Sequence, residues 1–378
     1  MIKILHVIPN LRKGGAERLV LDICRELSKR PDVEVRILVF SSDNQYDFLS
    51  EGIKIDFVPS SFTPSLVRRS SVNTELYDAY VREYLPDIIH SHLFEAELIT
   101  RRKPLHSSVY FTHCHDNIIQ FSRPSLLKNS LFGFIRKAYE RKLIFGYYKN
   151  CINHFVAISK DVQNYLNIHL PKTGYPASLL PNAIELDRFL RKERCLNSIE
   201  TLELINVGSL VPKKNQGLLL RILNLLKNKG VKCRLHCFGD GPDRETLCDL
   251  ATELLVEDLF FLHGNEDHIE SELEKANLYI HSAVYEPFGL VLLEAMASGL
   301  PVVCLDGKGN RDLIRDGVNG FIIEKEDVNL FAEKILWLVN HPEEYSRMSR
   351  EAIAFARQFD INPYVDRLLE LYRSAINS

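Results

Sequence analysis

Two glutamates interrupt an otherwise apolar stretch, HSAVYEPFGLVLLEAMASGLPVV at residues 281–303. Glu286 stands before a Pro-Phe-Gly turn, and Glu294 follows eight positions later, inside the helix that this turn is expected to open. Burying a carboxylate costs free energy unless the carboxylate binds something. We therefore interpret the pair as acceptors for the hydroxyl groups of a sugar or a ribose.

Two turns in the sequence are suited to phosphate. One precedes the helix around Glu294, where Phe288, Gly289 and Leu290 would offer backbone N–H groups to phosphate oxygens. The other is PNLRKGGAE near the N-terminus, where Gly14 and Gly15 let the backbone approach a ligand closely. A purely structural role for the glycine pair stays open, because the turn lacks the G-x-G-x-x-G pattern of a dinucleotide site.

Two adjacent lysines, Lys213 and Lys214, stand just before a helix expected to start near Asn215, in VGSLVPKKNQG. A cationic side chain at a strand-to-helix turn adds to the field of the helix N-terminus and suits a diphosphate. The alternative is that both lysines are solvated surface residues.

His113 and His115 are the first of two pairs that could ligate a metal. They end a strand in FTHCHDN, two positions apart and followed by Asp116. A zinc site needs further ligands, and local spacing suggests none. Cys233 and Cys237 would face the same side of another strand, where burial in the core is favoured over a metal site. We therefore expect no bound metal.

These side chains need strands and helices to position them, and the chain alternates between the two from end to end. Such βαβ alternation predicts an α/β fold with parallel sheets and helices on both faces, and it occurs twice. Ligands of such sheets bind at the carboxyl ends of the strands, where the residues above lie. The expected strands are 2–8, 33–40, 53–59, 87–92, 108–115 and 154–159 in the first half, and 202–208, 231–239, 259–264, 277–283, 301–305 and 320–324 in the second.

A proline-rich join is expected near 171–183, in PKTGYPASLLPNA. We therefore expect one domain over residues 1–175 and another over 176–357. The remainder, 358–378, reads as an amphipathic helix.

Charge differs between the two halves of this 378-residue chain, whose formal net charge is −3. Residues 1–175 hold 24 basic and 18 acidic side chains, net +6, and residues 176–378 hold 23 and 32, net −9. The average excludes a general nucleic-acid binder. Segment 121–150 alone has seven basic and one acidic residue, net +6, and is rich in aromatic residues. Such a helix suits an anionic membrane surface or a lipid-diphosphate acceptor, although a solvated basic face explains it too.

No stretch reaches the roughly 18 uncharged apolar residues of a membrane span. The N-terminus, MIKILHVIPN, lacks the features of a signal peptide. We expect a cytoplasmic protein, either free or peripheral on the inner face of the cytoplasmic membrane.

Taken together, the motifs resemble those of the retaining glycosyltransferases of family 4, and the resemblance covers nearly the whole chain. The E-x7-E stretch with its SGLPVV continuation is the specific part. The matching motifs are GGAE (14–17), HD (115–116), AISKDV (157–162), PNAIELDRF (181–189), VGSLVPKKNQ (207–216), FGDGP (238–242), EPFGLVLLE (286–294) and GNRDLIRDGVNG (309–320).

This resemblance implies the GT-B architecture, with two Rossmann-like domains facing across a cleft and the C-terminal helix crossing back to the first domain. It implies transfer of a sugar from a nucleotide-diphosphate sugar, with UDP expected, to a glycan or lipid-linked acceptor. The biosynthesis of a cell-surface polysaccharide or lipopolysaccharide is the expected setting. The N-terminal domain would bind the acceptor and the C-terminal domain the donor, without a metal or other cofactor.

The resemblance also implies a role for each candidate residue. Lys214 would bind the donor diphosphate, Glu294 the ribose and Glu286 the transferred sugar, while His115, rather than His113, would lie near the reacting sugar. The backbones of Phe288, Gly289 and Leu290, and of Gly14 and Gly15, would approach the diphosphate or the sugar.

One departure concerns Ser209, where many family members have an arginine as a second cation for the leaving phosphate. Lys213 would supply that charge, or the site has one cation fewer.

Three other classes of protein fit the sequence less well. An NAD dehydrogenase would need G-x-G-x-x-G after the first strand, and the E-x7-E stretch argues against a sugar-nucleotide epimerase. A non-catalytic partner subunit of the same fold would be expected to lose Glu286, Glu294 or Lys214, and all three are present.

Overall fold

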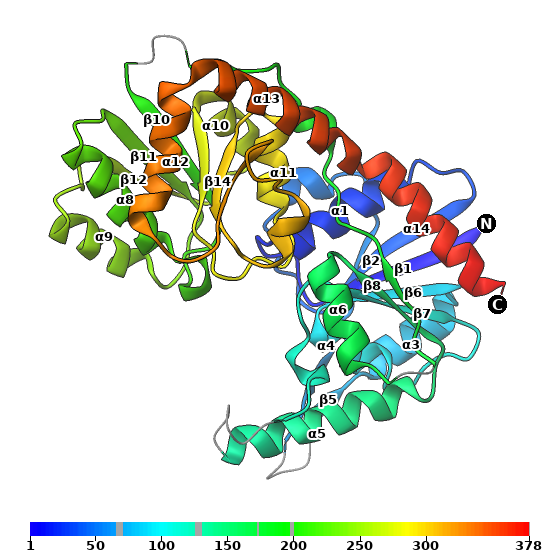
Figure 1. Ribbon diagram of the computed structural model, residues 1–378. Helices are drawn as coiled ribbons and strands as arrows, with labels where there is room; N and C mark the ends of the chain where they lie inside the picture. Colours follow the sequence, from blue (N-terminus) through cyan, green and yellow to red (C-terminus); the bar gives the residue numbers. More distant parts are fainter. Residues whose placement is uncertain (66–70, 125–130, 172–173, 197–199, 378) are drawn as a thin grey trace. The chain divides into compact units, whose positions relative to one another are not determined.

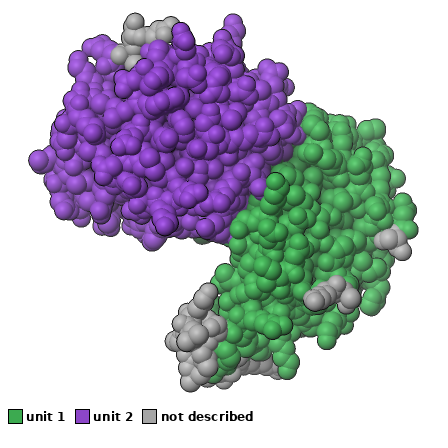
Figure 2. Space-filling view, in the orientation of Figure 1, with its two compact units in different colours: residues 1–182, 361–378 green, residues 183–360 purple. Residues whose placement is uncertain are grey.

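A computed structural model describes residues 1–378 except 66–70, 125–130, 172–173, 197–199 and 378. The chain forms two compact units (Figures 1 and 2). Unit 1 comprises Met1–Asn182 and Ile361–Ser378, and unit 2 comprises Ala183–Asp360. The division therefore falls after residues 182 and 360, against the 175 and 357 expected from sequence.

Unit 1 contains a seven-stranded parallel sheet in the order β3-β2-β1-β6-β7-β8-β9. β1 pairs with a strand on each side and is buried on both faces from Ile4 to Ile8, which is why it reads as the nearly continuous apolar run IKILHVI. A short antiparallel pair, β4 with β5, stands apart from this sheet. The strands are β1 (Ile2–Ile8), β2 (Val33–Val39), β3 (Ile55–Phe57), β4 (Ser61–Thr63), β5 (Ser71–Asn73), β6 (Ile88–His92), β7 (Val109–Cys114), β8 (Asn153–Ala157) and β9 (Ala177–Leu179).

The last helix of the chain, α14, belongs to unit 1 and packs against α1. Its apolar face is buried, and ion pairs join Arg30 to Asp366 and Arg373 to Asp32. The helices of unit 1 are α1 (Gly15–Leu27), α2 (Asp47–Ser50), α3 (Glu75–Tyr84), α4 (Phe94–Thr100), η1 (Ile119–Phe121), α5 (Leu131–Tyr148), α6 (Lys160–His169) and α14 (Ile361–Ile376).

Arg101, just after α4, is fully buried inside unit 1. Its guanidinium donates to the carbonyl oxygen of Phe111 at 2.8 Å and to Asn153 Oδ1 at 2.9 Å, and its Nε lies 3.5 Å from a Glu97 carboxylate oxygen. A buried cation is tolerated because its donors are satisfied and a carboxylate balances its charge.

Unit 2 contains a six-stranded parallel sheet in the order β12-β11-β10-β13-β14-β15, the order of a doubly wound Rossmann fold. The strands are β10 (Leu202–Val207), β11 (Cys233–Phe238), β12 (Phe260–Gly264), β13 (Leu278–His281), β14 (Val302–Leu305) and β15 (Gly320–Ile323). The helices are α7 (Leu186–Phe189), η2 (Pro212–Lys214), α8 (Gln216–Asn228), α9 (Arg244–Glu253), α10 (Ile269–Lys275), α11 (Leu290–Ala297), η3 (Gly309–Asp312), α12 (Val328–Asn340), α13 (Pro342–Ala356) and η4 (Arg357–Phe359).

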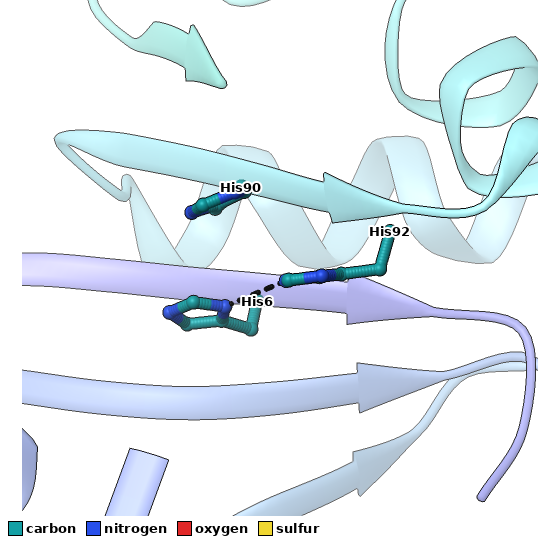
Figure 3. A group of neighbouring side chains, drawn as sticks. All are labelled: His6, His90 and His92. Carbon is teal, nitrogen blue, oxygen red and sulfur yellow. Dashed lines mark hydrogen bonds between the residues drawn. The ribbon is translucent and has the colours of Figure 1, made fainter. Parts of the chain in front are cut away.

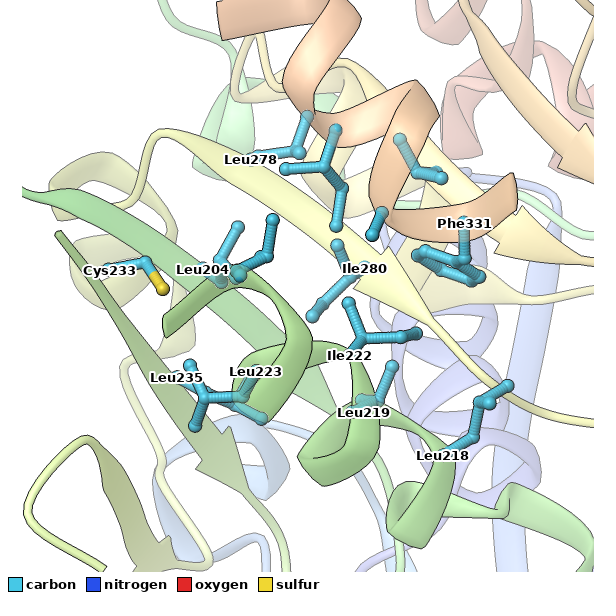
Figure 4. Packing of buried hydrophobic residues seen from close by; sticks show 14 of the residues in the cluster. Leu204, Leu218, Leu219, Ile222, Leu223, Cys233, Leu235, Leu278, Ile280 and Phe331 are labelled. Atoms are coloured by element: carbon cyan, nitrogen blue, oxygen red, sulfur yellow. The ribbon is translucent and has the colours of Figure 1, made fainter. Parts of the chain in front are cut away.

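One face of this sheet packs on α8 and α12 to form an apolar core (Figure 4). Leu204 and Ile280 from the strands meet Ile222 and Phe331 from the helices. Cys233 and Cys237 are both buried members of this cluster, as the core interpretation of the two cysteines predicts. The rigid core holds the strand ends, and therefore the loops that follow them.

All twelve strands expected from sequence are present, with ends shifted by at most two residues. Three short strands were missed. β4 and β5 have three residues each, and β9 lies inside the stretch interpreted as a join, where it forms an edge of the sheet. Strands this short carry too few residues for a hydrophobic alternation to show. Among the described helices, none is both long and apolar enough to qualify as a membrane span.

Candidate active site

Lys214 and Glu286 meet at the carboxyl end of the sheet in unit 2. Lys214 lies in η2, after β10, and Glu286 follows β13, the strand beside β10. The strand order reverses between these two strands, which is where doubly wound sheets bind ligands. The Lys214 ammonium lies 2.5 Å from a Glu286 carboxylate oxygen, so the structure joins the two predicted residues in an ion pair.

His281, the last residue of β13, also contacts this pair. Its Nε2 lies 3.1 Å from the same Glu286 oxygen. Burial alone would raise the pKa of Glu286, but the Lys214 charge and the His281 hydrogen bond outweigh it and lower that pKa to about 2. Burial lowers the pKa of His281, so the ring is neutral and its Nε2–H donates to the carboxylate.

Two glycines of the next loop let the backbone around Glu286 pack closely. A Cβ on Gly307 would lie 2.8 Å from the Cβ of Glu286, and one on Gly309 would lie 1.8 Å from the carbonyl oxygen of Pro287. The Glu286 N–H donates to the Gly307 carbonyl at 2.7 Å, and the Gly309 N–H donates to the Glu286 carbonyl at 3.1 Å. The Glu286 carboxylate is therefore placed by backbone contacts that only small residues permit.

The helix that follows, α11, begins at Leu290 rather than at the Pro-Phe-Gly turn. Gly289 precedes it in the left-handed conformation, with φ of +98°. Over the described part of the chain, the backbone N–H groups of Phe288, Gly289 and Leu290 have no hydrogen-bond acceptor. Phe288 and Gly289 are buried and Leu290 is half-buried. Open N–H groups at a helix start attract anions.

The remaining candidates of unit 2 are placed as follows. Glu294 lies inside α11 and is 7% exposed, as expected for a carboxylate held away from bulk water. Ser209 is exposed in the loop after β10, and its carbonyl accepts a hydrogen bond from Gln216. Lys213 is exposed, and its carbonyl accepts from the N–H of Val284.

In unit 1, Gly14 and Gly15 lie at the start of α1, after β1. The Gly14 N–H and carbonyl both bond the hydroxyl of Tyr46, at 3.0 and 2.9 Å. The Glu17 carboxylate folds back toward Gly14, where any added Cβ would lie 2.3 Å from it. Burial raises the pKa of Glu17 beside this turn.

His115 lies just past the end of β7, with its Nε2 2.9 Å from Nδ1 of His92. The rings of His113 and His115 stack with centroids 4.4 Å apart, which confirms that they share one face. Ring nitrogens of His92, His113 and His115 lie within 4.8 Å of one another, as do those of His6, His90 and His92. Each group is of the composition that holds zinc.

The sequence analysis did not single out His281 in unit 2, or His90 and His92 in unit 1. His281 was overlooked because a lone histidine in an apolar strand gives no signal. His90 and His92 repeat the H-x-H spacing of 113 and 115, which places each pair on one face of its strand. That the two pairs are neighbours depends on β6 pairing with β7, which local spacing does not show.

Two family models match the chain. The model "Glycosyltransferase Family 4" matches residues 13–188, and "Glycosyl transferases group 1" matches residues 196–355. The first match lies almost entirely in unit 1 and the second in unit 2. Each match thus falls mainly on one of the two units.

Curated relatives agree with these matches. The chain is 22% identical to the UDP-Gal:alpha-D-GlcNAc-diphosphoundecaprenol alpha-1,3-galactosyltransferase of Escherichia coli, over 98% of this chain and 96% of that protein. It is 28% identical to the poly(ribitol-phosphate) alpha-N-acetylglucosaminyltransferase of Staphylococcus aureus, over 51% of this chain and 40% of that protein. The chain spans less than half the length of several of the curated relatives it matches.

The fold has solved counterparts. The structure of Anabaena HepE in complex with UDP and glucose superposes with a TM-score of 0.79, at 19% identity, over 99% of this chain and 100% of that one. HepE and the other solved neighbours share the GT-B arrangement of two doubly wound domains. The chain is therefore similar to glycosyltransferases along both units, and its fold is that of the solved GT-B structures.

Proposed function

We propose that the protein is a retaining glycosyltransferase of family 4 that takes a sugar from a nucleotide-diphosphate sugar, with UDP as the nucleotide. The observation that carries this proposal is the Lys214–Glu286 pair at the switch point of the unit 2 sheet, beside the open N–H groups of α11. An ammonium and a helix start suit a diphosphate, and a buried ionised carboxylate suits sugar hydroxyls. The E. coli relative is named for a UDP-sugar donor, and HepE was solved with UDP and glucose.

The donor-binding roles follow from this chemistry. Lys214 and the N–H groups of Phe288, Gly289 and Leu290 would hold the diphosphate, and Lys213 would add the charge absent at Ser209. Glu294 would accept hydrogen bonds from the ribose, and Glu286 from the transferred sugar. In unit 1, Gly14 and Gly15 would contact the diphosphate and His115 the reacting sugar.

The mechanism we infer needs no metal. Negative charge develops on the departing diphosphate, where Lys214 and the N–H groups stabilise it electrostatically. The acceptor hydroxyl attacks the anomeric carbon from the face that the diphosphate leaves, so configuration is retained. The acceptor is a glycan or lipid-linked saccharide in the synthesis of a surface polysaccharide or lipopolysaccharide. The polyprenyl-diphosphate acceptor in the name of the E. coli relative supports that class.

The experiment begins with a calorimetric screen of nucleotide sugars, followed by transfer to a panel of lipid-linked acceptors. Glu286→Ala and Lys214→Ala should each lower transfer by a factor on the order of 100 or more, because each removes a charge that contacts the donor. Circular dichroism would verify that both variants stay folded. Wild-type rates in both variants would contradict the site assignment, and donor binding without transfer to any acceptor would favour the non-catalytic partner subunit.

A further inference from the structure

Five histidines form a stack in unit 1, on three neighbouring strands. His6 comes from β1, His90 and His92 from β6, His113 from β7, and His115 follows β7. In the sheet register His6 lies opposite His90, and His92 lies opposite His113. All but His115 are buried to 98% or more, and His115 is half-buried.

Three of these rings form one hydrogen-bonded row that ends at the predicted site residue. His6 Nδ1 lies 2.9 Å from His92 Nε2 (Figure 3), and His92 Nδ1 lies 2.9 Å from His115 Nε2. His92 therefore uses both of its nitrogens inside the row. A neutral imidazole has one N–H and one bare nitrogen, so the two hydrogen bonds must run in the same direction along the row.

Neutral rings are what this environment favours. Burial, with the nearby His113, lowers the pKa of His6 to about 3, and burial also holds the pKa of His92 and His115 well below the usual range. Two protonated rings of the stack would also repel each other, because neighbouring rings lie about 5 Å apart.

The direction in which the row donates its hydrogen bonds follows from the surroundings of His6, at the buried end of the row. Nε2 of His6 is buried and has no hydrogen-bond partner among the described residues. If the row donated toward His6, that nitrogen would carry an N–H with nothing to bond. Buried N–H groups without a partner are rarer in proteins than buried acceptors without one. The favoured arrangement therefore has His6 Nδ1–H donating to His92, and His92 Nδ1–H donating to His115.

We propose that His6 and His92 fix His115 as the neutral Nδ1–H tautomer, so that His115 presents a hydrogen-bond donor, and not a general base, to an oxygen of the bound sugar or its acceptor. Nε2 of His115 is occupied as the acceptor of the row. Its Nδ1 has no partner in the described part of unit 1 and is not among the buried unpartnered atoms. The placement of His115 beside substrate rests on the proposed function, whereas the tautomer rests on the hydrogen bonds of the row and on the burial of its rings. His6 and His92 are positioning residues in this arrangement.

The tautomer is measured directly on the full chain labelled with 15N-histidine at pH 7. Long-range proton–nitrogen correlation spectra distinguish Nδ1–H from Nε2–H rings, and His115→Asn identifies the His115 signals by difference. Nδ1–H rings at His6, His92 and His115 are expected. An Nε2–H or a charged ring at His115 overturns the proposal, whether or not the protein transfers sugar.

The alternative to the hydrogen-bonded row is a transition metal bound by the ring nitrogens. Zinc at His92, His113 and His115 would take the nitrogen lone pairs that the row uses. The same spectra recorded after EDTA treatment and after addition of one equivalent of Zn2+ should be unchanged at these three residues. Zinc-induced shifts confined to them would overturn the row.

Matched amide variants test the donor in catalysis. The amide nitrogen of Asn stands where Nδ1 of histidine stands, and that of Gln where Nε2 stands. His115→Asn should therefore keep kcat within about tenfold of wild type, while His115→Gln should lose a factor on the order of 100 to 1000, as for removal of one preorganised donor.

His92 offers the corresponding test of positioning. His92→Asn keeps a donor to His115 and should keep kcat, whereas His92→Leu should lower kcat with little change in KM for the donor. UDP affinity and thermal midpoints serve as folding controls. A Gln variant of His115 more active than the Asn variant, or equal rates in both His92 variants, would contradict the assignment.

Discussion

At the scale of single residues, the candidate site depends on charges that balance one another inside unit 2. Glu286 accepts from both Lys214 and His281, and so stays ionised despite burial. Lys214 and Glu286 could each be predicted from sequence as ligands. Their ion pair could not, because it depends on two loops that meet only after β10 and β13 have paired.

The lowered pKa of Glu286 predicts a pH-dependent contribution to stability. A carboxylate with a pKa of about 2 in the folded state and about 4.5 when unfolded stabilises the fold fully above pH 4.5, and this contribution is lost as pH falls toward 2. Relative to Glu286→Gln, the wild type should lose about 3 kcal/mol of unfolding free energy between pH 5 and pH 2.

Urea denaturation followed by fluorescence of Trp337, the single tryptophan, reports this loss in unit 2. Glu253→Gln, at an exposed position of α9, is the matched control and should show no such pH-dependent difference. A wild-type advantage over Glu286→Gln that is constant from pH 5 to pH 2 would refute the prediction.

Gly309 predicts a steric effect on the same carboxylate. In Gly309→Ala the new Cβ would overlap the Pro287 carbonyl, so the backbone beside Glu286 must move. We expect a cost of about 1–3 kcal/mol in unfolding free energy and UDP affinity weakened about tenfold or more. Calorimetry with UDP measures the second effect.

Gly146→Ala is the control, because nothing lies within 4 Å of its added Cβ in α5. It should leave UDP affinity unchanged and raise stability by about 0.5–1 kcal/mol, since alanine favours a helix. Unchanged UDP affinity in Gly309→Ala would show that the loop tolerates displacement of Glu286.

At the scale of elements, local sequence patterns predict where the strands lie along the chain, but they do not predict which strands pair in the sheet. Apolar runs such as IKILHVI mark buried strands, whereas the order β3-β2-β1-β6 follows from chain crossovers. The histidine stack shows the consequence. Its H-x-H pairs are visible in the sequence, but the row through His6, His92 and His115 needs β1, β6 and β7 side by side.

Arg101 joins α4 to the strands of unit 1 and predicts a large effect on stability. Arg101→Met removes the cation but leaves the Glu97 carboxylate buried, so unit 1 should lose about 3–5 kcal/mol. Denaturation followed by circular dichroism should show the loss, while the Trp337 transition of unit 2 should not shift.

The neighbouring Arg102→Met is the control, because Arg102 is partly exposed and pairs with Asp78 only at 4.0 Å. The double variant Arg101→Met with Glu97→Gln should regain part of the loss. Equal stability of the Arg101 and Arg102 variants would mean that the buried pair contributes nothing.

At the scale of the whole molecule, the charge difference between the halves has a location in unit 1. Segment 121–150 carries the positive excess, and its residues 125–130 lie outside the described part of the structure. Within α5, Phe132 and Ile135 are 62% and 45% exposed beside Arg136. Exposed apolar side chains next to cations suit an anionic lipid surface, and we propose that the protein binds the inner face of the membrane there.

Liposome flotation tests this surface. The full chain should float with vesicles containing about one-third anionic lipid, and about 0.5 M salt should release it because salt screens the attraction. Replacing both Phe132 and Ile135 by Ser should abolish flotation, whereas Ile168→Ser, which alters a 73% exposed isoleucine on α6, should not. No salt-sensitive binding by the wild type would mean that the basic face of α5 is simply solvated.

Because α14 belongs to unit 1, the two units can finish folding in the reverse of their order along the chain. Unit 2 is continuous in sequence, from Ala183 to Asp360, whereas unit 1 lacks α14 until the residues that follow Asp360 have been made. During synthesis the later unit can therefore finish folding before the earlier one, the reverse of the usual N-terminal-first order. Until α14 arrives, the face of α1 that it covers stays open, and the newly made chain exposes apolar surface that a chaperone would recognise.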